Sequence, residues 1–255
     1  MFTIGCDPEL FIREKYTNKY KSAVGKIGGS KDHPVPIDGV GHAILEDNVA
    51  VEFNIAPADS LPAFRASIHK VLDHLRGILP DYVFDQESAV SFPEDELQTP
   101  EAQMFGCEPD FDAWNMRENK KPCAPDPNLR SCGGHIHVGS SVAIANRINT
   151  IRAMDLFLGA TSVALDKGSL RRQLYGKAGC FRPKPYGVEY RTLSNFWIFN
   201  DSLIDWAYEG TQRALAFVEA GNTIHEQDGQ IIQQCINEGD MNAYNYLAST
   251  YQLNG

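Results

Sequence analysis

The sequence has no long apolar run, no surplus of basic residues and no closely paired cysteines, and each absence excludes a class of protein. No apolar stretch is long enough to cross a bilayer, so we expect no membrane association. Lys and Arg number 23 against 33 Asp and Glu, for a formal net charge of −10. A non-specific nucleic-acid binder needs the opposite balance, because it neutralises phosphates with cations.

Two further absences concern redox state and nucleotide motifs. The six cysteines include no Cys-x-x-Cys pair, and residues 1–5 open the chain without a basic region or a signal-peptide core. We therefore predict reduced thiols in a cytoplasmic protein, rather than three disulfides or a zinc site. The glycine-rich segment 21–41 lacks the Gly-x-x-x-x-Gly-Lys-Ser/Thr spacing of a P-loop. We expect a mobile loop there, either a plain surface loop or a lid over a phosphate or substrate.

What is present is the composition of an ordinary globular protein. The 255 residues are 43% hydrophobic and 22% charged, which allows a sizeable core in one large domain or two small ones. Apolar residues at helical spacing predict helices at 60–79, 140–167, 201–220, 223–237 and 241–251. A strand is expected at 81–92. The Gln- and Asn-rich C-terminal helices suit packing or a homo-oligomer.

The most informative stretch is 131–139, Ser-Cys-Gly-Gly-His-Ile-His-Val-Gly. Side chains alternate along a strand, so His135 and His137 share one face. Glycines around them leave room for close approach by a ligand or another backbone. Two imidazoles at this spacing can bind one cation, or a cation and its phosphate, although a strand histidine is equally often structural.

Three other segments show the same alternation, at 2–12, 42–57 and 187–193. Pro8 lacks an N–H donor, so the first strand is predicted to be an edge or to bulge there. The polar faces carry, in chain order, Asp7 and Glu9, Glu52 and Asn54, His135 and His137, and Glu189 and Arg191. Acids and imidazoles gathered on one face repel each other unless cations lie between them. We therefore predict an α+β fold whose curved, mostly antiparallel sheet holds Mg²⁺ or Mn²⁺ on its concave face.

Cations are concentrated between residues 171 and 184, as Arg171, Arg172, Lys177, Arg182 and Lys184. A solvated charge run is one interpretation. Glycines and aromatics interleave with these cations, which favours a loop that binds a polyphosphate. Together with the predicted metals, this segment indicates phosphoryl transfer from ATP.

Residues 106–111 echo residues 5–10, which adds two acids to the candidate site. The echo is either a chance match or a sign that Glu108 and Asp110 lie at the same cavity. We interpret both as candidates to accept the proton of an attacking amine.

The order Asp-x-Glu, Glu-x-Asn, Gly-Gly-His-x-His, Glu-x-Arg resembles the glutamine synthetase / glutamate–cysteine ligase superfamily. Within it, the sequence is most similar to the small phage-encoded carboxylate–amine ligases. The stretches 5–11, 47–57, 131–139, 171–182 and 188–193 carry the resemblance. It implies a single glutamine synthetase-like catalytic domain over 1–255, with a sheet-lined funnel, helices on its outer face and the C-terminal helices from about 201 packed on it.

The resemblance also implies an ADP-forming ligase that uses ATP and Mg²⁺ or Mn²⁺ to join a small-molecule or peptide carboxylate to an amine through an acyl phosphate, in the host cytoplasm. The implied metal ligands are Asp7, Glu9, Glu52, His135 and Glu189. The implied phosphate-binding residues are His137, Arg171, Arg172, Lys177, Arg182 and Arg191. Glu52, His135, Glu189 and Arg191 are the expected catalytic residues, and Asn54, Glu108 and Asp110 are expected to contact substrate.

Three other functions remain open from the residues alone. A cupin-like metal oxidoreductase would use the two histidines and a carboxylate without ATP. A metal-dependent hydrolase would use His-x-His on a barrel strand, but the regular βα alternation of such barrels is missing. A non-catalytic nucleotide-binding relative would keep the fold without the catalytic activity.

Overall fold

The computed structural model describes residues 1–103, 110–120 and 126–253. Helices and antiparallel strands are mixed along the chain, which agrees with the predicted α+β class. The strands of the four motifs do not all belong to one sheet. They divide between a central sheet and an N-terminal sheet, which meet at the candidate site.

The central sheet has the order β1-β12-β14-β13-β9-β10. Its strands are β1 Thr3–Cys6, β12 Ile136–Gly139, β14 Gly187–Tyr190, β13 Cys180–Lys184, β9 Phe111–Asp112 and β10 Arg117–Glu118. The registers of this sheet place His137 opposite both Gly5 and Glu189. The histidine strand is therefore flanked directly by the first and last motifs.

The N-terminal sheet has the order β3-β2-β6-β5-β4, and β7 pairs with β2 beside it. Its strands are β2 Glu9–Glu14, β3 Tyr20–Lys21, β4 Val35–Pro36, β5 Ala43–Asp47, β6 Ala50–Asn54 and β7 Tyr82–Asp85. Glu9 lies opposite Glu52 in the β2–β6 pairing. A separate two-stranded ladder joins β8 Ala89–Ser91 to β11 Leu129–Ser131.

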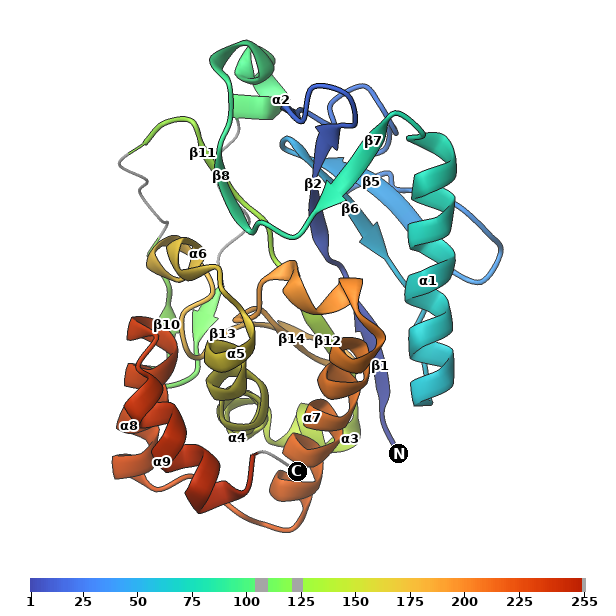
Figure 1. The fold of residues 1–255 in the computed structure, drawn as a ribbon. Helices are drawn as coiled ribbons and strands as arrows, with labels where there is room; N and C mark the ends of the chain where they lie inside the picture. Colours follow the sequence, from blue (N-terminus) through green and yellow to red (C-terminus); the bar gives the residue numbers. More distant parts are fainter. Residues whose placement is uncertain (104–109, 121–125, 254–255) are drawn as a thin grey trace.

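Pro8 separates the two sheets. The predicted strand 2–12 breaks there into β1 and β2, which form one dark blue run from the central to the N-terminal sheet (Figure 1). Pro8 lacks the N–H that a continuing ladder needs, so the strand ends before it, and β1 is an edge strand of the central sheet, as one of the two predicted alternatives requires. The flanking amides bond to the histidine segment instead, Asp7 N–H to His135 O and Glu9 N–H to Gly133 O (3.4 and 2.9 Å).

Three other predicted strands turn out to be interrupted. Segment 131–139 belongs to β11 only at Ser131 and to β12 only from Ile136, so His135 lies just before β12. Segment 42–57 is a hairpin of β5 and β6, because Asn48 adopts a left-handed turn conformation with φ of 57°. Segment 81–92 contributes β7 and β8 to different sheets.

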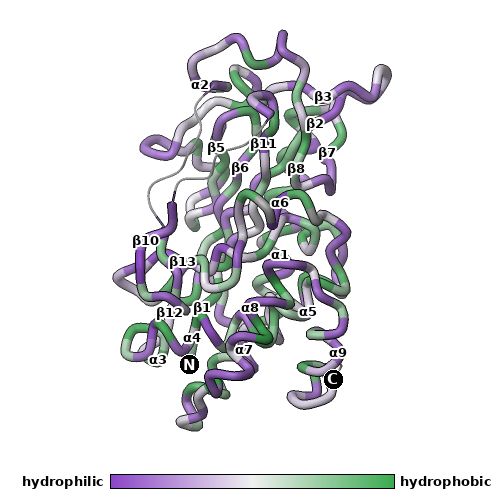
Figure 2. Tube along the Cα trace, turned by 90° about the vertical axis from the view of Figure 1, so that its left-hand side faces the viewer, coloured by the Kyte–Doolittle hydropathy of each residue, from purple (hydrophilic) through white to green (hydrophobic). Residues whose placement is uncertain are grey.

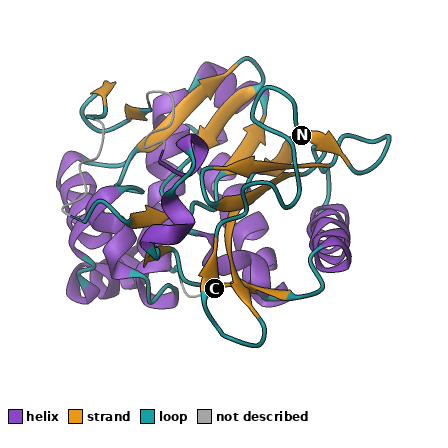
Figure 3. Ribbon diagram, turned by 90° about the horizontal axis from the view of Figure 1, so that it is seen from above, coloured by secondary structure: helices purple, strands orange, loops and turns teal. Residues whose placement is uncertain are grey.

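Helices account for most of the remaining described chain. They are α1 Leu61–Ile78, α2 Pro100–Gln103, α3 Ser141–Ala145, α4 Arg147–Met154, α5 Ala160–Leu165, α6 Ser169–Leu174, α7 Asp201–Glu219, α8 Glu226–Glu238 and α9 Met241–Tyr251, with 3-10 turns at Glu94–Leu97 and Asn195–Phe199 and a π-helical turn at Asp155–Gly159. Seen from above, the strands lie between α1 on one side and the main group of helices on the other (Figure 3).

The predicted helix at 140–167 is divided in the structure. It breaks at Asn146 and passes through the π-helical turn before α5. Each irregularity shifts the phase of the helix, so Ile144 and Leu165 are 44% and 41% exposed although the simple period predicts them buried. The other predicted helices agree with α1, α7, α8 and α9 to within a few residues.

One large hydrophobic cluster includes side chains from Ile4 to Leu253 and packs both sheets against the helices. A smaller cluster around Phe11 and Phe92 lies on the opposite face of β2 from Leu10 and Ile12. The chain is hydrophobic along the inner strands and hydrophilic in outer loops such as the turn beside β3 (Figure 2). Every helix in the described ranges is too short or too polar to cross a membrane. The prediction of a single domain stays a prediction.

Four of the six cysteines lie in the described ranges, Cys6, Cys132, Cys180 and Cys235. All four are free and buried, which agrees with the prediction of reduced thiols. Cys107 and Cys123 lie outside the described residues.

Candidate functional site

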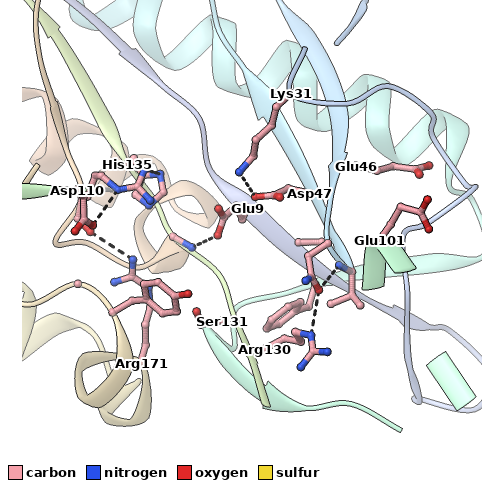
Figure 4. Close-up of a pocket in the computed structure, with 18 of the residues that line it drawn as sticks. Glu9, Lys31, Glu46, Asp47, Glu101, Asp110, Arg130, Ser131, His135 and Arg171 are labelled. Carbon is pink, nitrogen blue, oxygen red and sulfur yellow. Dashed lines mark hydrogen bonds and ion pairs between the residues drawn. The ribbon is translucent and has the colours of Figure 1, made fainter. Parts of the chain in front are cut away.

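A cavity of about 490 Å³ opens where the two sheets meet. Its lining includes Glu9, Asp47, Asp110, His135, Arg171 and Arg191. Figure 4 shows the acids of the N-terminal sheet on one side of the cavity, with His135, Asp110 and Arg171 on the other. The cavity therefore combines carboxylates with buried guanidinium groups.

The first group of acids comprises Glu9, Asp47 and Glu52, whose carboxylate oxygens lie within 4.8 Å of one another. Glu9 and Glu52 are only 9% and 7% exposed. The backbone N–H of Gly133 donates to Glu9 Oε2 at 2.6 Å and fixes its direction. Burial raises the pKa of Glu52 well above its ordinary value, and repulsion from Asp7, Asp47 and Glu9 adds to this rise.

The alternation pattern did not predict Asp47 as a site residue. In an uninterrupted strand at 42–57, its side chain would lie on the same apolar face as Val49 and Val51. The turn after Asp47 reverses the chain and pairs Asp47 with Ala50, two residues before Glu52. Asp47 and Glu52 therefore project from the same face of the hairpin. An acid followed by Asn at a hairpin turn was the available signal.

The second group comprises Asp7, His137 and Glu189, and it is largely neutralised within the protein. His137 Nε2 lies 3.1 Å from Asp7 Oδ1, and Lys184 Nζ lies 2.7 Å from Glu189 Oε2. Arg191 also pairs with Glu189. Burial and Asp7 act to raise the pKa of Glu189, but Arg191, His135 and His137 outweigh them and lower it to about 2.

His135 lies between the two groups and is 4% exposed. Its Nδ1 lies 3.4 Å from Asp7 Oδ1 and 3.3 Å from Arg191 Nη1. Both imidazoles of the motif thus meet the same carboxylate of Asp7, as their predicted shared face requires. Burial and the neighbouring Arg191 lower the pKa of His135, so its neutral form is favoured.

The glycines of the motif have separate steric roles. A Cβ added to Gly134 would lie 2.2 Å from the carbonyl oxygen of Ser194, so close backbone approach requires glycine here. A Cβ on Gly133 would meet the ring of His135 at 2.2 Å. Gly133 therefore leaves room for the imidazole itself.

Two arginines reach the cavity from the C-terminal half of the chain. Arg171 is 3% exposed and donates from Nη1 to Thr192 O at 3.0 Å. Arg191 Nε lies 3.5 Å from Asp110 Oδ2, which also brings Asp110 to the cavity as predicted. Both guanidinium groups are therefore positioned by the chain around the end of β14.

The remaining predicted residues lie elsewhere. Arg172 is directed away from the cavity, because its guanidinium pairs with Asp166 at 3.3 Å and donates to Ser162 O at 3.1 Å. Lys177 is exposed. The cavity lining also omits the predicted His137, Arg182 and Asn54, as well as Glu52 and Glu189, which are buried. Glu108 lies outside the described residues.

The predicted metal ligands thus form two adjoining groups, not one. Asp7 contacts both imidazoles of the motif, and its charge also acts on Glu52 of the first group. The two groups differ in charge balance. The first group keeps an excess of carboxylates, and the second group is neutralised by basic side chains.

Comparison with known proteins bears on this site. No curated protein matches the sequence. Residues 127–216, which include the histidine strand, Arg171 and Arg191, match the model of the family described as phage phiEco32-like COOH-NH2 ligase-type 2. The name of that family indicates a carboxylate–amine ligase, and the match confirms the predicted resemblance of this chain to the phage carboxylate–amine ligases.

Proposed function

We propose that the protein is an ATP-dependent carboxylate–amine ligase with a glutamine synthetase-like catalytic fold. The observation that carries the proposal is one cavity lined both by Glu9 and Asp47 and by the buried Arg171 and Arg191. Figure 4 shows Arg171 on the opposite side of the cavity from Asp47. Excess carboxylates suit divalent cations, and fixed guanidinium groups suit phosphates. The match of residues 127–216 supports the same reaction class.

The acids of the first group fit a divalent cation such as Mg²⁺ or Mn²⁺. Glu9, Asp47 and Glu52 offer oxygen ligands within 4.8 Å of one another. Burial and mutual repulsion favour a proton on Glu52, and a cation bound here would favour its ionised form instead. The second group fits less well, because Lys184 and Arg191 already neutralise Glu189. When bound, the metal supplies charge neutralisation of the phosphate oxygens.

The reaction we propose has two steps with balanced groups. The substrate carboxylate attacks the γ-phosphorus of ATP and releases ADP, giving an acyl phosphate. An amine then attacks the acyl carbon, phosphate leaves, and one proton is lost as the amide forms. Phosphorylation of the carboxylate gives the acyl carbon phosphate as its leaving group, in place of oxide, which is a very poor one.

The protein's own groups have defined parts in this scheme. Arg171 and Arg191 hold phosphoryl oxygens and stabilise the charge that develops during transfer. Asp110 orients Arg191 through their ion pair and lines the cavity, where its carboxylate receives the amine proton. Neutral His135 contributes a hydrogen bond to a phosphate oxygen or a metal ligand.

The test is an ADP-release screen over pairs of carboxylates and amines, with mass spectrometry of the products. We expect one pair to give ADP, phosphate and an amide in equal amounts. Glu52→Gln keeps the shape of the side chain and removes its charge, so turnover should fall at least about 100-fold. The exposed Glu238→Gln on α8 is the matched control and should keep full turnover. Unchanged turnover in Glu52→Gln would contradict the role of the first group.

A further inference from the structure

Lys31 brings a cation of the protein to the first group of acids. Its Nζ lies 2.8 Å from Asp47 Oδ2, and Figure 4 shows the side chain extending to this carboxylate. Its charge also acts on Glu52, where it opposes the rise in pKa. The ammonium therefore neutralises part of the charge that a divalent cation would neutralise.

The backbone that carries Lys31 is held firmly. Glu46 accepts hydrogen bonds from the backbone N–H groups of Gly25, Ile27 and Gly28 at 2.7 to 2.9 Å. Gly29 has φ of +82°, and a Cβ there would lie 3.0 Å from the carbonyl oxygen of Ile44. Strain and crowding both require glycine at this point. Residues 25–28 of the glycine-rich segment are thus anchored to Glu46, and the mobility expected for 21–41 stays a prediction.

The tip of this turn is closed and faces the cavity. Ser30 and His33 exchange two backbone hydrogen bonds of 3.1 Å, and residues 30–32 line the cavity. The side chain of Lys31 is 48% exposed, although its backbone is fixed. Four rotatable bonds let the ammonium swing while the turn stays in place.

We infer that Lys31 exchanges partners during the catalytic cycle. It pairs with Asp47 when no metal is bound, yields that carboxylate to the divalent cation, and then contacts a phosphate oxygen of the nucleotide. This inference rests on the proposed function and adds a residue to it. A fixed ion pair that never contacts the nucleotide would leave ATP affinity unchanged when Lys31 is replaced.

The exchange predicts opposite effects on two ligands. In Lys31→Met the competing cation is gone, so Mn²⁺ without nucleotide should bind about threefold more tightly, or more. The same variant loses a phosphate contact, so ATP in saturating Mn²⁺ should bind about tenfold more weakly. Isothermal titration calorimetry on the full-length protein measures both affinities without any need for turnover.

Three comparisons make the test specific. Lys31→Arg keeps the charge and should retain most of the competition with Mn²⁺. Lys26→Met changes a lysine of the same turn that lies over the ring of Tyr82, and it should leave both affinities unchanged. In an Asp47→Asn background, Lys31→Met should no longer tighten Mn²⁺ binding, because the competing pair is already lost.

The outcomes separate the inference from the proposed function. Tighter Mn²⁺ binding together with weaker ATP binding supports the exchange. Unchanged Mn²⁺ or ATP affinity in Lys31→Met, or a loss of both, overturns it while the proposed function stands. Failure of the wild-type protein to bind Mn²⁺ or ATP overturns the proposed function and the exchange with it.

Discussion

Adjacent residues can have unrelated roles, and Arg171 and Arg172 illustrate this at the scale of single side chains. Both were predicted to bind phosphate, because they belong to one run of cations. On α6 they diverge by about 100° around the helix axis. Arg171 lines the cavity, and Arg172 is buried against Asp166 and Ser162. Only the first retains a geometric basis for binding phosphate.

Replacing each arginine by methionine should separate the two roles. Arg171→Met removes a cavity cation, so ATP affinity should fall at least about tenfold. Arg172→Met leaves buried Asp166 without its cation, which should lower the free energy of unfolding by about 3 kcal/mol and keep ATP affinity near wild type. Calorimetric ATP titration and urea unfolding measure these effects. If Arg172→Met lost ATP affinity while Arg171→Met kept it, the phosphate-binding role would belong to Arg172 instead of Arg171.

At the scale of elements, the site depends on two places where strands end. Pro8 ends β1 and sends β2 into the second sheet, so Asp7 and Glu9 fall into different groups of acids. The turn at Asn48 returns the chain and brings Asp47 beside Glu52. Both interruptions use residues whose backbone preference is visible in the sequence. Their effect on which acids meet depends on the pairing of strands.

The entry to β12 should tolerate no side chain at Gly134. A Cβ there would lie 2.2 Å from Ser194 O and 2.7 Å from Trp197 Nε1. Gly134→Ala should therefore lower the free energy of unfolding by about 3 kcal/mol. Gly39→Ala is the control, because no atom lies within 4 Å of the added Cβ, and its effect should stay within about 0.5 kcal/mol. If the two variants were equally stable in urea unfolding, the predicted steric clash at residue 134 would be contradicted.

At the scale of the whole molecule, Asp155 ties the helical layer to the central sheet. This buried carboxylate accepts hydrogen bonds from Trp114 Nε1, Gly179 N–H, Tyr190 Oη and Thr192 Oγ1 at 2.6 to 3.2 Å. Burial outweighs these bonds and raises the pKa of Asp155 from 3.8 to about 7. Because the folded value lies above the unfolded one, its contribution to stability is full below about pH 4. That contribution is lost as the pH rises through 7.

The pH dependence of unfolding should reveal this titration. Relative to Asp155→Asn, the wild type should lose roughly 4 kcal/mol of stability between about pH 4 and pH 7, and no more above that range. Urea unfolding at half-unit pH steps measures the difference between the two curves. Asp73→Asn, on the exposed side of α1, should keep the wild-type profile. A constant difference between wild type and Asp155→Asn would show that Asp155 stays ionised in the folded protein.

The sequence by itself determined which residue types the site contains and where the long helices lie along the chain. Alternation and helical period are local properties, so the acid and histidine motifs, α1 and the three C-terminal helices were predictable. Only the tertiary structure decided which of these charged groups meet. Which side chains meet depends on the register of the paired strands, on strand breaks such as the one at Pro8, and on the rotation of α6 that directs Arg171 to the cavity. A shift of one residue along a strand or helix moves a side chain from the cavity to a buried position elsewhere.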